Sequence, residues 1–243
     1  TAWDDVSDKF LDQDLVKKAR QVEMEYFRKL KVYTHVPRSH QRQTGGKIIG
    51  VRWVDVNKGD DADRNYRSRL VGKEFKTNID DTLYAPTPPL EALRYILSDA
   101  ATLRSTGGNH EERRQVMVND VARAYFYATC TRDVYIELPA EDGAGPDVIG
   151  KLNLCLYGTR DAAVNWQETL SGHLVGLGFL RSAAFPCVFA HPSRDMLTLV
   201  HGDDYVTSGK SADLDWLQSE LEKAYEIKST RVGPKAKQQG KVF

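Results

Sequence analysis

Two short apolar runs that end in aspartate constrain the fold of this chain more than any other feature. The run QVMVNDV (115–121) predicts a buried strand with Asp120 at its end. CVFAHPSRDMLTLVHGDDYVTSG (187–209) predicts two antiparallel strands, a sharp turn at Gly202 to Asp204, and a third short strand. A Gly-Asp-Asp turn is usually only a turn, but strands on both sides make it a hairpin that presents acids at its tip.

Carboxylates gathered at strand ends have a predictable chemistry. Burying unpaired carboxylates costs free energy, and two or three of them in one place repel one another. Such an arrangement calls for a cation. Hard oxygen ligands suit Mg²⁺, which keeps most of its waters and takes one or two protein carboxylates together with substrate phosphate oxygens.

The rest of the chain interleaves helical and strand patterns irregularly. This predicts an α+β layer, a sheet with helices on one face. KIIGVRWVDVN and YRSRLVGKEF form a predicted hairpin whose arms carry Arg52, Arg67, Arg69 and Lys73. Predicted helices cover 8–30, 90–103, 160–177 and 213–225, with Trp166 and Leu170 of the third in the core. A turn-rich, basic stretch closed by Gly45 and Gly46 follows the first helix, RDVYIELP is a further strand, ARAYFYA is a brief helix or tight corner, and a basic tail follows residue 226.

Composition excludes several classes of protein. The chain has 243 residues, with 41% hydrophobic residues and 34 Lys+Arg against 34 Asp+Glu, which is an ordinary globular composition. No apolar run is long enough to span a bilayer and the N-terminus lacks a signal peptide, so we expect an intracellular protein, cytoplasmic or nuclear, with no membrane partner. Three scattered cysteines, Cys130, Cys155 and Cys187, argue against a disulfide framework or zinc site, and we expect them reduced and buried.

Zero net charge would normally count against a nucleic-acid partner, but the charge is segregated. Five aspartates lie in the first fourteen residues, whereas 28–42, 64–76 and 227–243 are locally basic. Basic runs are more often solvated faces than binding sites.

The motifs VNDVARAYF, LCLYGTRDAAVNW and LVHGDDYVTSG, in this order, resemble the reverse transcriptase of copia-type LTR retrotransposons. SRLVGKEF and YAPT resemble motifs on the fingers side of the same family, so the resemblance covers roughly 45–232. It implies one reverse transcriptase domain fragment built as a right-hand polymerase. The palm, an antiparallel sheet backed by helices, would take about 88–126 and 159–243, the fingers about 1–87 and 127–158, and the thumb would be largely absent.

The activity implied by the resemblance is RNA-directed DNA polymerisation, the transfer of deoxynucleotides from dNTPs to a primer 3′-hydroxyl on an RNA or DNA template. Asp120, Asp203 and Asp204 would be catalytic and would hold two Mg²⁺ ions, or Mn²⁺, with Val121 lending a carbonyl. One ion would lower the pKa of the primer hydroxyl, and the other would hold the triphosphate. Integrase and RNase H, the rest of the polyprotein, would be partners.

The resemblance also implies a nucleotide site. Tyr125 would act as a steric gate that excludes the 2′-hydroxyl, and the alternative is a core aromatic beside Phe126. Backbone amides of 122–124 would cradle the triphosphate. The remaining candidates are Arg123, Ala124, Tyr157 and Gly158 in the nucleotide pocket, Arg160 near phosphate or template, and Arg67, Arg69 and Lys73 on the triphosphate, unless this hairpin is only a solvated basic strand.

Two motifs depart from the family pattern. His201-Gly202 replaces Tyr-Val before the acidic pair, at a place that would contact the primer, and predicts altered fidelity. Asp161-Ala162-Ala163 replaces Gln-Ala-Pro after Arg160. Two other functions stay open: a catalytically silent or domesticated remnant that binds nucleic acid or protein, and another palm-type nucleotidyl transferase such as a cyclase. Retention of the three acids and Tyr125 argues against decay.

Overall fold

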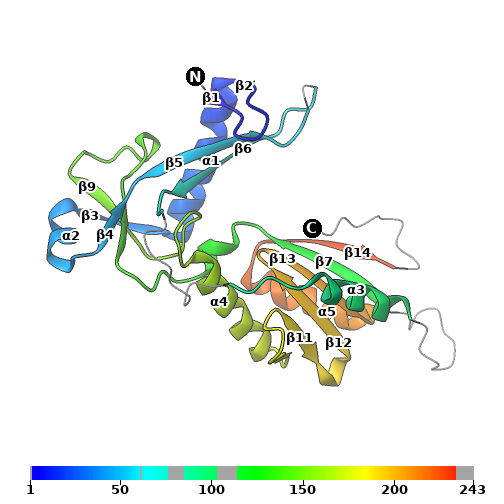
Figure 1. Cartoon of the computed structure of the whole chain (residues 1–243). Coiled ribbons are helices and arrows are strands. Elements are labelled where there is room, and N and C mark those ends of the chain that lie inside the picture. The colour runs from blue at the N-terminus through cyan, green and yellow to red at the C-terminus, as the bar shows by residue number, and fades with distance from the viewer. Residues whose placement is uncertain (1, 61, 76–84, 103–113, 234–243) are drawn as a thin grey trace. The chain divides into compact units, whose positions relative to one another are not determined.

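The chain folds into two compact units in a computed structural model that describes residues 2–60, 62–75, 85–102 and 114–233 (Figure 1). Unit 1 comprises Thr1–Leu83 and Tyr125–Trp166, and unit 2 comprises Tyr84–Ala124 and Gln167–Phe243. Each unit therefore combines two separate stretches of the chain. Helices and mostly antiparallel sheets occur together, which confirms the α+β class.

Unit 1 contains a long helix, a two-stranded hairpin and a four-stranded sheet. Its helices are α1 (Gln13–Leu30) and α2 (Arg38–Thr44), and 3₁₀ turns lie at Ala124–Tyr127 and Ala140–Asp142. The hairpin pairs β5 (Val51–Asn57) with β6 (Tyr66–Gly72), as predicted, and α1 packs on β6. The sheet has the order β3 (Tyr33–Pro37), β9 (Val148–Leu152), β8 (Val134–Ile136), β4 (Lys47–Ile49), in which β4 and β8 are parallel. A short ribbon of β1 (Ala2–Trp3) and β2 (Phe10–Leu11) precedes α1.

Three local predictions in unit 1 were wrong. The first helix begins at Gln13 and not at residue 8, because the Asp12 carboxylate caps it by accepting from the amides of Asp14 and Leu15 at 2.9 and 3.2 Å. The run KIIGVRWVDVN is broken at Gly50 into two strands that join different sheets. Residues 33–44, expected as turns, form β3 and α2, and β9 was not predicted.

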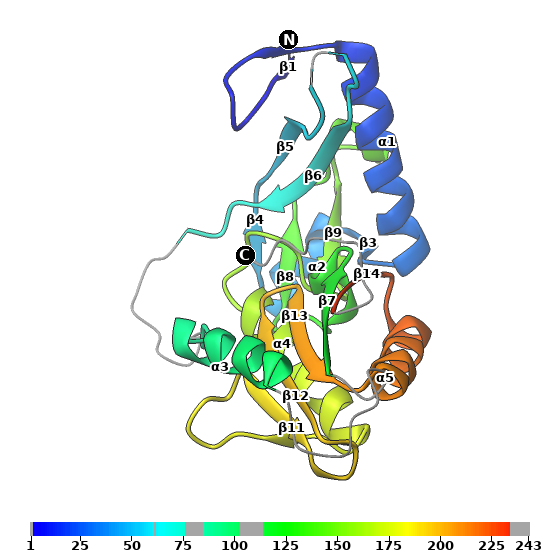
Figure 2. The same cartoon turned by 90° about the vertical axis from the view of Figure 1, so that its right-hand side faces the viewer.

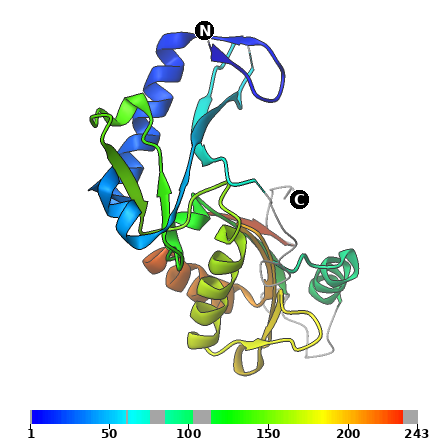
Figure 3. The ribbon, with the colours of Figure 1, turned by 60° about the vertical axis from the view of Figure 1, so that its left-hand side comes forward.

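Unit 2 is a six-stranded antiparallel sheet covered on both faces. The strands lie in the order β10 (Leu180–Arg181), β11 (Val188–His191), β12 (Met196–His201), β13 (Asp204–Gly209), β7 (Gln115–Val121), β14 (Ile227–Val232). Its helices are α3 (Leu90–Ala101), α4 (Ala162–Gly176), whose first residues belong to unit 1, and α5 (Ser211–Ala224). Figure 2 and Figure 3 show α3 on one face of the sheet and α5 and α4 on the other.

The prediction of helices on one face only was therefore wrong. Ile96 of α3 packs with Leu199 and Val206 on one face, whereas Tyr205, which points to the opposite face of β13, is also buried. Strands buried on both faces read as nearly continuous apolar runs, which is how β12, with the sequence MLTLVH, reads. Residues 227–232 were expected as a tail but form β14, and 234–243 lie outside the described residues.

The predicted core positions on α4 are confirmed, since Trp166 and Leu170 are fully buried. Cys155 and Cys187 are buried as expected, whereas Cys130 is only half-buried. In the part of the chain that the structure describes, no helix is long and apolar enough to cross a membrane.

Candidate active site

The three predicted acids lie together at one end of two neighbouring strands in unit 2. Asp204 at the start of β13 is paired in register with Asp120 near the end of β7. Asp203 lies in the preceding turn, and its carbonyl accepts a hydrogen bond from the amide of Val121 at 3.0 Å. Residues paired across antiparallel strands point to the same face, so the Asp120 and Asp204 side chains share a face of the sheet. The same register places Val118 and Val206 on that face.

The charges in this acidic cluster, Asp120, Asp203 and Asp204, act on one another. Partial burial, and then the charges of Asp203 and Asp120, raise the pKa of Asp204 to about 6, against an opposing effect of His201. Asp120 is exposed and Asp203 half-buried. Carboxylates that lie together and repel one another, one of them partly buried, fit the chemistry of a bound cation.

The side chains that the structure describes do not form a complete metal cage by themselves. Among the residues that the structure describes, no three His, Cys, Asp or Glu side chains are grouped so as to hold a metal ion. Mg²⁺ needs no such cage, because it binds through one or two carboxylates and completes its shell with water and phosphate oxygens. The donor set of the acidic cluster therefore fits Mg²⁺ held jointly with a phosphate-bearing ligand.

The turn that carries the acids depends on glycine. Gly202 has φ of 63°, in the left-handed region that a β-branched residue adopts only with strain. His201 is exposed beside it, so both residues predicted to contact primer lie at the open tip of the hairpin.

Lys228 is a charged residue of this edge that sequence reasoning treated only as part of a basic tail. It lies on β14 directly opposite Asp120 in register, and it is exposed. The polar sequence IKSTRV of β14 gives only a weak strand signal. The pairing of this strand with β7 could therefore not be inferred from the sequence. The amide of Ala122, one of those expected to cradle the triphosphate, donates to the carbonyl of Glu226 at 2.9 Å. Ala124 is buried and Arg123 has φ of 54°.

Several predicted nucleotide-site residues come together in unit 1. The Tyr125 and Tyr157 rings lie 4.6 Å apart, and the guanidinium carbon of Arg69 lies 4.8 Å from the Tyr157 ring centroid. We call Tyr125, Tyr157 and Arg69 the aromatic cluster. Arg67 lies two residues before Arg69 on the same face of β6 and is exposed. Tyr125 is half-buried while Phe126 is in the core, so the reading of Tyr125 as a core residue is not supported.

The end of β6 holds the loop that carries Tyr157. The amide of Gly72 donates to the Tyr157 carbonyl at 2.7 Å, and the amide of Glu74 donates to the Gly158 carbonyl at 3.3 Å. Gly158 has φ of 83°, and a Cβ there would lie 2.1 Å from the Gly72 oxygen. Lys73, whose amide donates to the Gly50 carbonyl at 2.8 Å, lies beside this loop.

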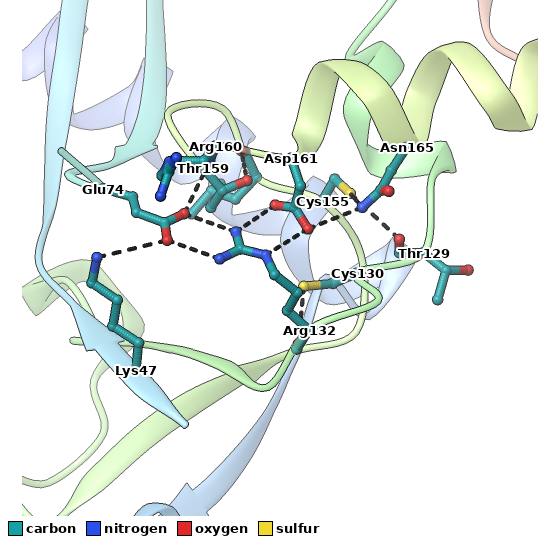
Figure 4. Close-up of polar contacts among 11 residues, drawn as sticks. Lys47, Glu74, Thr129, Cys130, Arg132, Cys155, Thr159, Arg160, Asp161 and Asn165 are labelled. Atoms are coloured by element: carbon teal, nitrogen blue, oxygen red, sulfur yellow. Dashed lines mark hydrogen bonds and ion pairs between the residues drawn. The ribbon is translucent and has the colours of Figure 1, made fainter. Parts of the chain in front are cut away.

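Sequence reasoning missed the residues that surround Arg160. Figure 4 shows the Arg132 guanidinium between the carboxylates of Glu74 and Asp161, and the amide of Arg160 donates to Glu74 Oε2 at 2.9 Å. Burial opposes ionisation of Glu74, but hydrogen bonds from Arg132 and the Arg160 amide hold its pKa at about 2. The only sequence signal for these contacts was Asp161 itself, which stands where the family motif has Gln.

The chain belongs to the reverse transcriptase (RNA-dependent DNA polymerase) family, whose sequence profile matches residues 30–236. It is a copia-type reverse transcriptase domain, which confirms the resemblance drawn from its motifs.

The chain is similar to short parts of much longer polyproteins. The Retrovirus-related Pol polyprotein from transposon TNT 1-94 of Nicotiana tabacum is 28% identical over 92% of this chain and 16% of its own length. That from transposon RE1 of Arabidopsis thaliana is 26% identical over 69% of this chain and 11% of its own length. The Truncated transposon Ty1-A Gag-Pol polyprotein of Saccharomyces cerevisiae is 28% identical over 47% of this chain and 9% of its own length. The chain thus spans less than a fifth of these relatives.

Proposed function

We propose that this chain is an RNA-directed DNA polymerase that adds deoxynucleotides to a primer 3′-hydroxyl by metal-dependent nucleotidyl transfer. The observation that carries the proposal is the pairing of Asp120 with Asp204, beside Asp203, at the strand ends of a reverse transcriptase family member. The partners are an RNA or DNA template with primer, dNTPs, and the remainder of a polyprotein.

The acidic cluster would hold two Mg²⁺ or Mn²⁺ ions. When bound, such ions supply Lewis-acid activation of the primer hydroxyl and neutralise charge on the triphosphate and leaving pyrophosphate. The carboxylates of Asp120, Asp203 and Asp204 would hold these ions, and the Val121 carbonyl would be a further ligand. The exposed Lys228 ammonium, opposite Asp120, offers a positive charge to a phosphate at the same edge.

The aromatic cluster would contact the incoming nucleotide. Tyr125 excludes a 2′-hydroxyl by its bulk, and Tyr157 and Gly158 line the pocket. Arg67, Arg69 and Lys73 bind the triphosphate, and Arg160 contacts phosphate or template. Arg123 and Ala124 support the triphosphate, and His201 and Gly202 contact the primer end. In this proposal unit 2 corresponds to the palm and unit 1 to the fingers, and the protein acts inside the cell.

Primer extension tests the proposal. The parent chain should extend oligo(dT) on poly(rA) with dTTP and Mg²⁺ or Mn²⁺, and Asp203→Asn should lower the rate by at least about a hundredfold, because the substitution removes a carboxylate needed to hold the metal ion. Glu222→Gln, which neutralises an exposed carboxylate on α5, is the matched control and should leave the rate unchanged. Equal incorporation by the parent and Asp203→Asn would end the proposal.

A further inference from the structure

Arg132 joins two buried carboxylates that lie far from it in sequence. Its Nε and Nη2 donate to Asp161 Oδ2 and Oδ1 at 2.9 and 2.6 Å. Its Nη1 and Nη2 donate to Glu74 Oε1 and Oε2 at 3.0 and 2.9 Å. One guanidinium therefore makes two forked pairs at once, a geometry that Lys cannot reproduce (Figure 4).

Burial makes this clamp of Glu74, Arg132 and Asp161 sensitive to the loss of its cation. The Glu74 and Asp161 side chains are 1% and 4% exposed, whereas that of Arg132 is 37% exposed. Without Arg132, two desolvated carboxylates would face one another, which costs far more than a surface ion pair gains. Lys47 Nζ, at 3.7 Å from Glu74 Oε1, is a partial substitute for one carboxylate only.

The clamp holds the segment that carries Tyr157. Glu74 Oε2 accepts from the amide of Arg160, and the Glu74 amide donates to the Gly158 carbonyl. Asp161 Oδ2 also accepts from Asn165 Nδ2 at 3.1 Å, on the first turns of α4. Residues 158–161 are thus fixed at both ends, and the ring of Tyr157, the residue before them, lies 4.6 Å from the Tyr125 ring at an interplanar angle of 43°.

Another arginine of unit 1 makes an equally well-formed pair without this connection. Arg38 donates to Glu137 Oε1 and Oε2 at 2.8 and 2.7 Å, and its side chain is 33% exposed. This pair joins α2 to the residue after β8 and touches none of the predicted nucleotide-site residues. Arg38 is therefore a control for the loss of a forked ion pair outside the clamp, at a site where the partner carboxylate, Glu137, is 45% exposed.

We infer that Arg132 is a positioning residue for deoxynucleotide binding, acting through Glu74 and Asp161 on the loop that carries Tyr157, Gly158 and Arg160. This inference rests on the proposed polymerase function. A loop that is free to shift would misplace the Tyr157 ring and the Arg160 side chain relative to the nucleotide, which weakens binding more than it slows chemistry.

Steady-state extension of oligo(dT) on poly(rA) by the full chain tests the inference. Arg132→Gln should raise KM for dTTP by about tenfold while kcat stays within about threefold, and it should reduce discrimination against UTP. Arg132→Lys keeps the charge but engages one carboxylate at a time, so its KM should be intermediate. Arg38→Gln should leave KM and discrimination unchanged. A parent that extends, with Arg132→Gln matching Arg38→Gln in KM, would overturn the inference and leave the proposed function intact.

Hydrogen exchange gives a readout that is independent of activity. In Arg132→Gln the amides of residues 156–161 should exchange faster, with a smaller increase in Arg132→Lys, while Arg38→Gln leaves this segment unchanged. Unchanged exchange in Arg132→Gln would overturn the inference whatever the extension assay shows. A parent chain whose extension does not depend on Asp203 would contradict the proposed function instead.

Discussion

At the scale of single residues, the raised pKa of Asp204 couples the acidic cluster to pH. Burial, then the charges of Asp203 and Asp120, raise this pKa to about 6. Between the ordinary carboxyl pKa near 4 and a value near 6, the folded state binds more protons than the unfolded chain, so stability falls as pH rises through this window and is constant above it. Asp204→Asn should therefore raise the free energy of unfolding at pH 7 by on the order of 1 kcal/mol, after allowance for solvent screening.

Urea denaturation near pH 4 and at pH 7 checks this prediction. The gain should be present at pH 7 and largely lost near pH 4, where Asp204 is protonated in the folded state and only about half ionised in the unfolded chain. Glu222→Gln, an exposed carboxylate on another element, should show no such pH dependence. A gain for Asp204→Asn that is equal at both pH values would contradict the electrostatic origin.

A second prediction at this scale concerns the close approach of Gly158 to Gly72. Gly158 and Gly143 have nearly equal φ, 83° and 85°, but a Cβ at Gly143 meets nothing within 4 Å. Gly143→Ala should cost only the backbone strain, roughly 1–2 kcal/mol. Gly158→Ala adds a clash with the Gly72 oxygen and should cost about 3–4 kcal/mol of unfolding free energy. Equal losses in urea denaturation would show that the loop relaxes and that the approach to β6 is not needed.

At the scale of elements, β14 is attached to β7 by more than its backbone. Asn119 Nδ2 donates to Ser229 Oγ at 2.7 Å between residues paired in register, and Asn119 is fully buried. Ser229→Ala leaves this amide donor without its acceptor and should cost about 1–2 kcal/mol of unfolding free energy. Replacing both partners, Asn119→Val with Ser229→Ala, removes the buried polar group and should cost less than Ser229→Ala alone.

Urea denaturation of the single and double variants measures this difference. Hydrogen exchange of residues 227–232 should rise in Ser229→Ala, because the outer strand loses a side-chain tie. A double variant less stable than Ser229→Ala would mean that Asn119 contributes through packing and not through this hydrogen bond.

The elements that sequence predicted best are those with strong local patterns. β7 was predicted with the bounds that it has, and β12 and β13 followed from an apolar run interrupted by a glycine turn. β14 and β3 were missed because their sequences, IKSTRV and YTHVP, are polar or mixed, and such strands owe their state to the partner strand. The prediction of helices on one face of the sheet failed because an apolar run such as that of β12 indicates a strand that is buried on both faces. Such a strand needs helices on both sides of the sheet.

The candidate site shows the same limit. Asp120, Asp203 and Asp204 were predicted as site residues because each follows an apolar run in the sequence. The clamp was not, since Arg132 lies 29 residues from Asp161 and 58 from Glu74, and no periodic pattern joins such positions. The aromatic cluster could be proposed from motif resemblance, but the contact of Arg69 with Tyr157 could be known only from the folded chain.

At the scale of the whole molecule, the proposed activity is divided between two units with separate cores. Unit 1 is built around Phe27, Leu70 and Phe126, and unit 2 around Ile96 and Leu199. The acidic cluster belongs to unit 2, and the aromatic cluster and clamp belong to unit 1. Binding of Mg²⁺ should therefore protect amides of unit 2, and contacts of the nucleotide with the aromatic cluster should protect amides of unit 1. Hydrogen exchange can distinguish these two effects.

Mg²⁺ alone should slow exchange at residues 118–121 and 203–206 of unit 2 and leave 154–162 of unit 1 unchanged, because the acidic cluster lies in unit 2 and the Asp161 carboxylate of unit 1 is already paired with Arg132. Addition of dTTP with Mg²⁺ should extend protection to 154–162, through Tyr157 and Arg160. For local opening, a ligand at a hundred times its Kd slows exchange by up to about a hundredfold. Asp203→Asn should lose the response to Mg²⁺, whereas Glu222→Gln should keep it. Protection by Mg²⁺ that is equal in both units, or that survives Asp203→Asn, would show that the ion binds outside the acidic cluster.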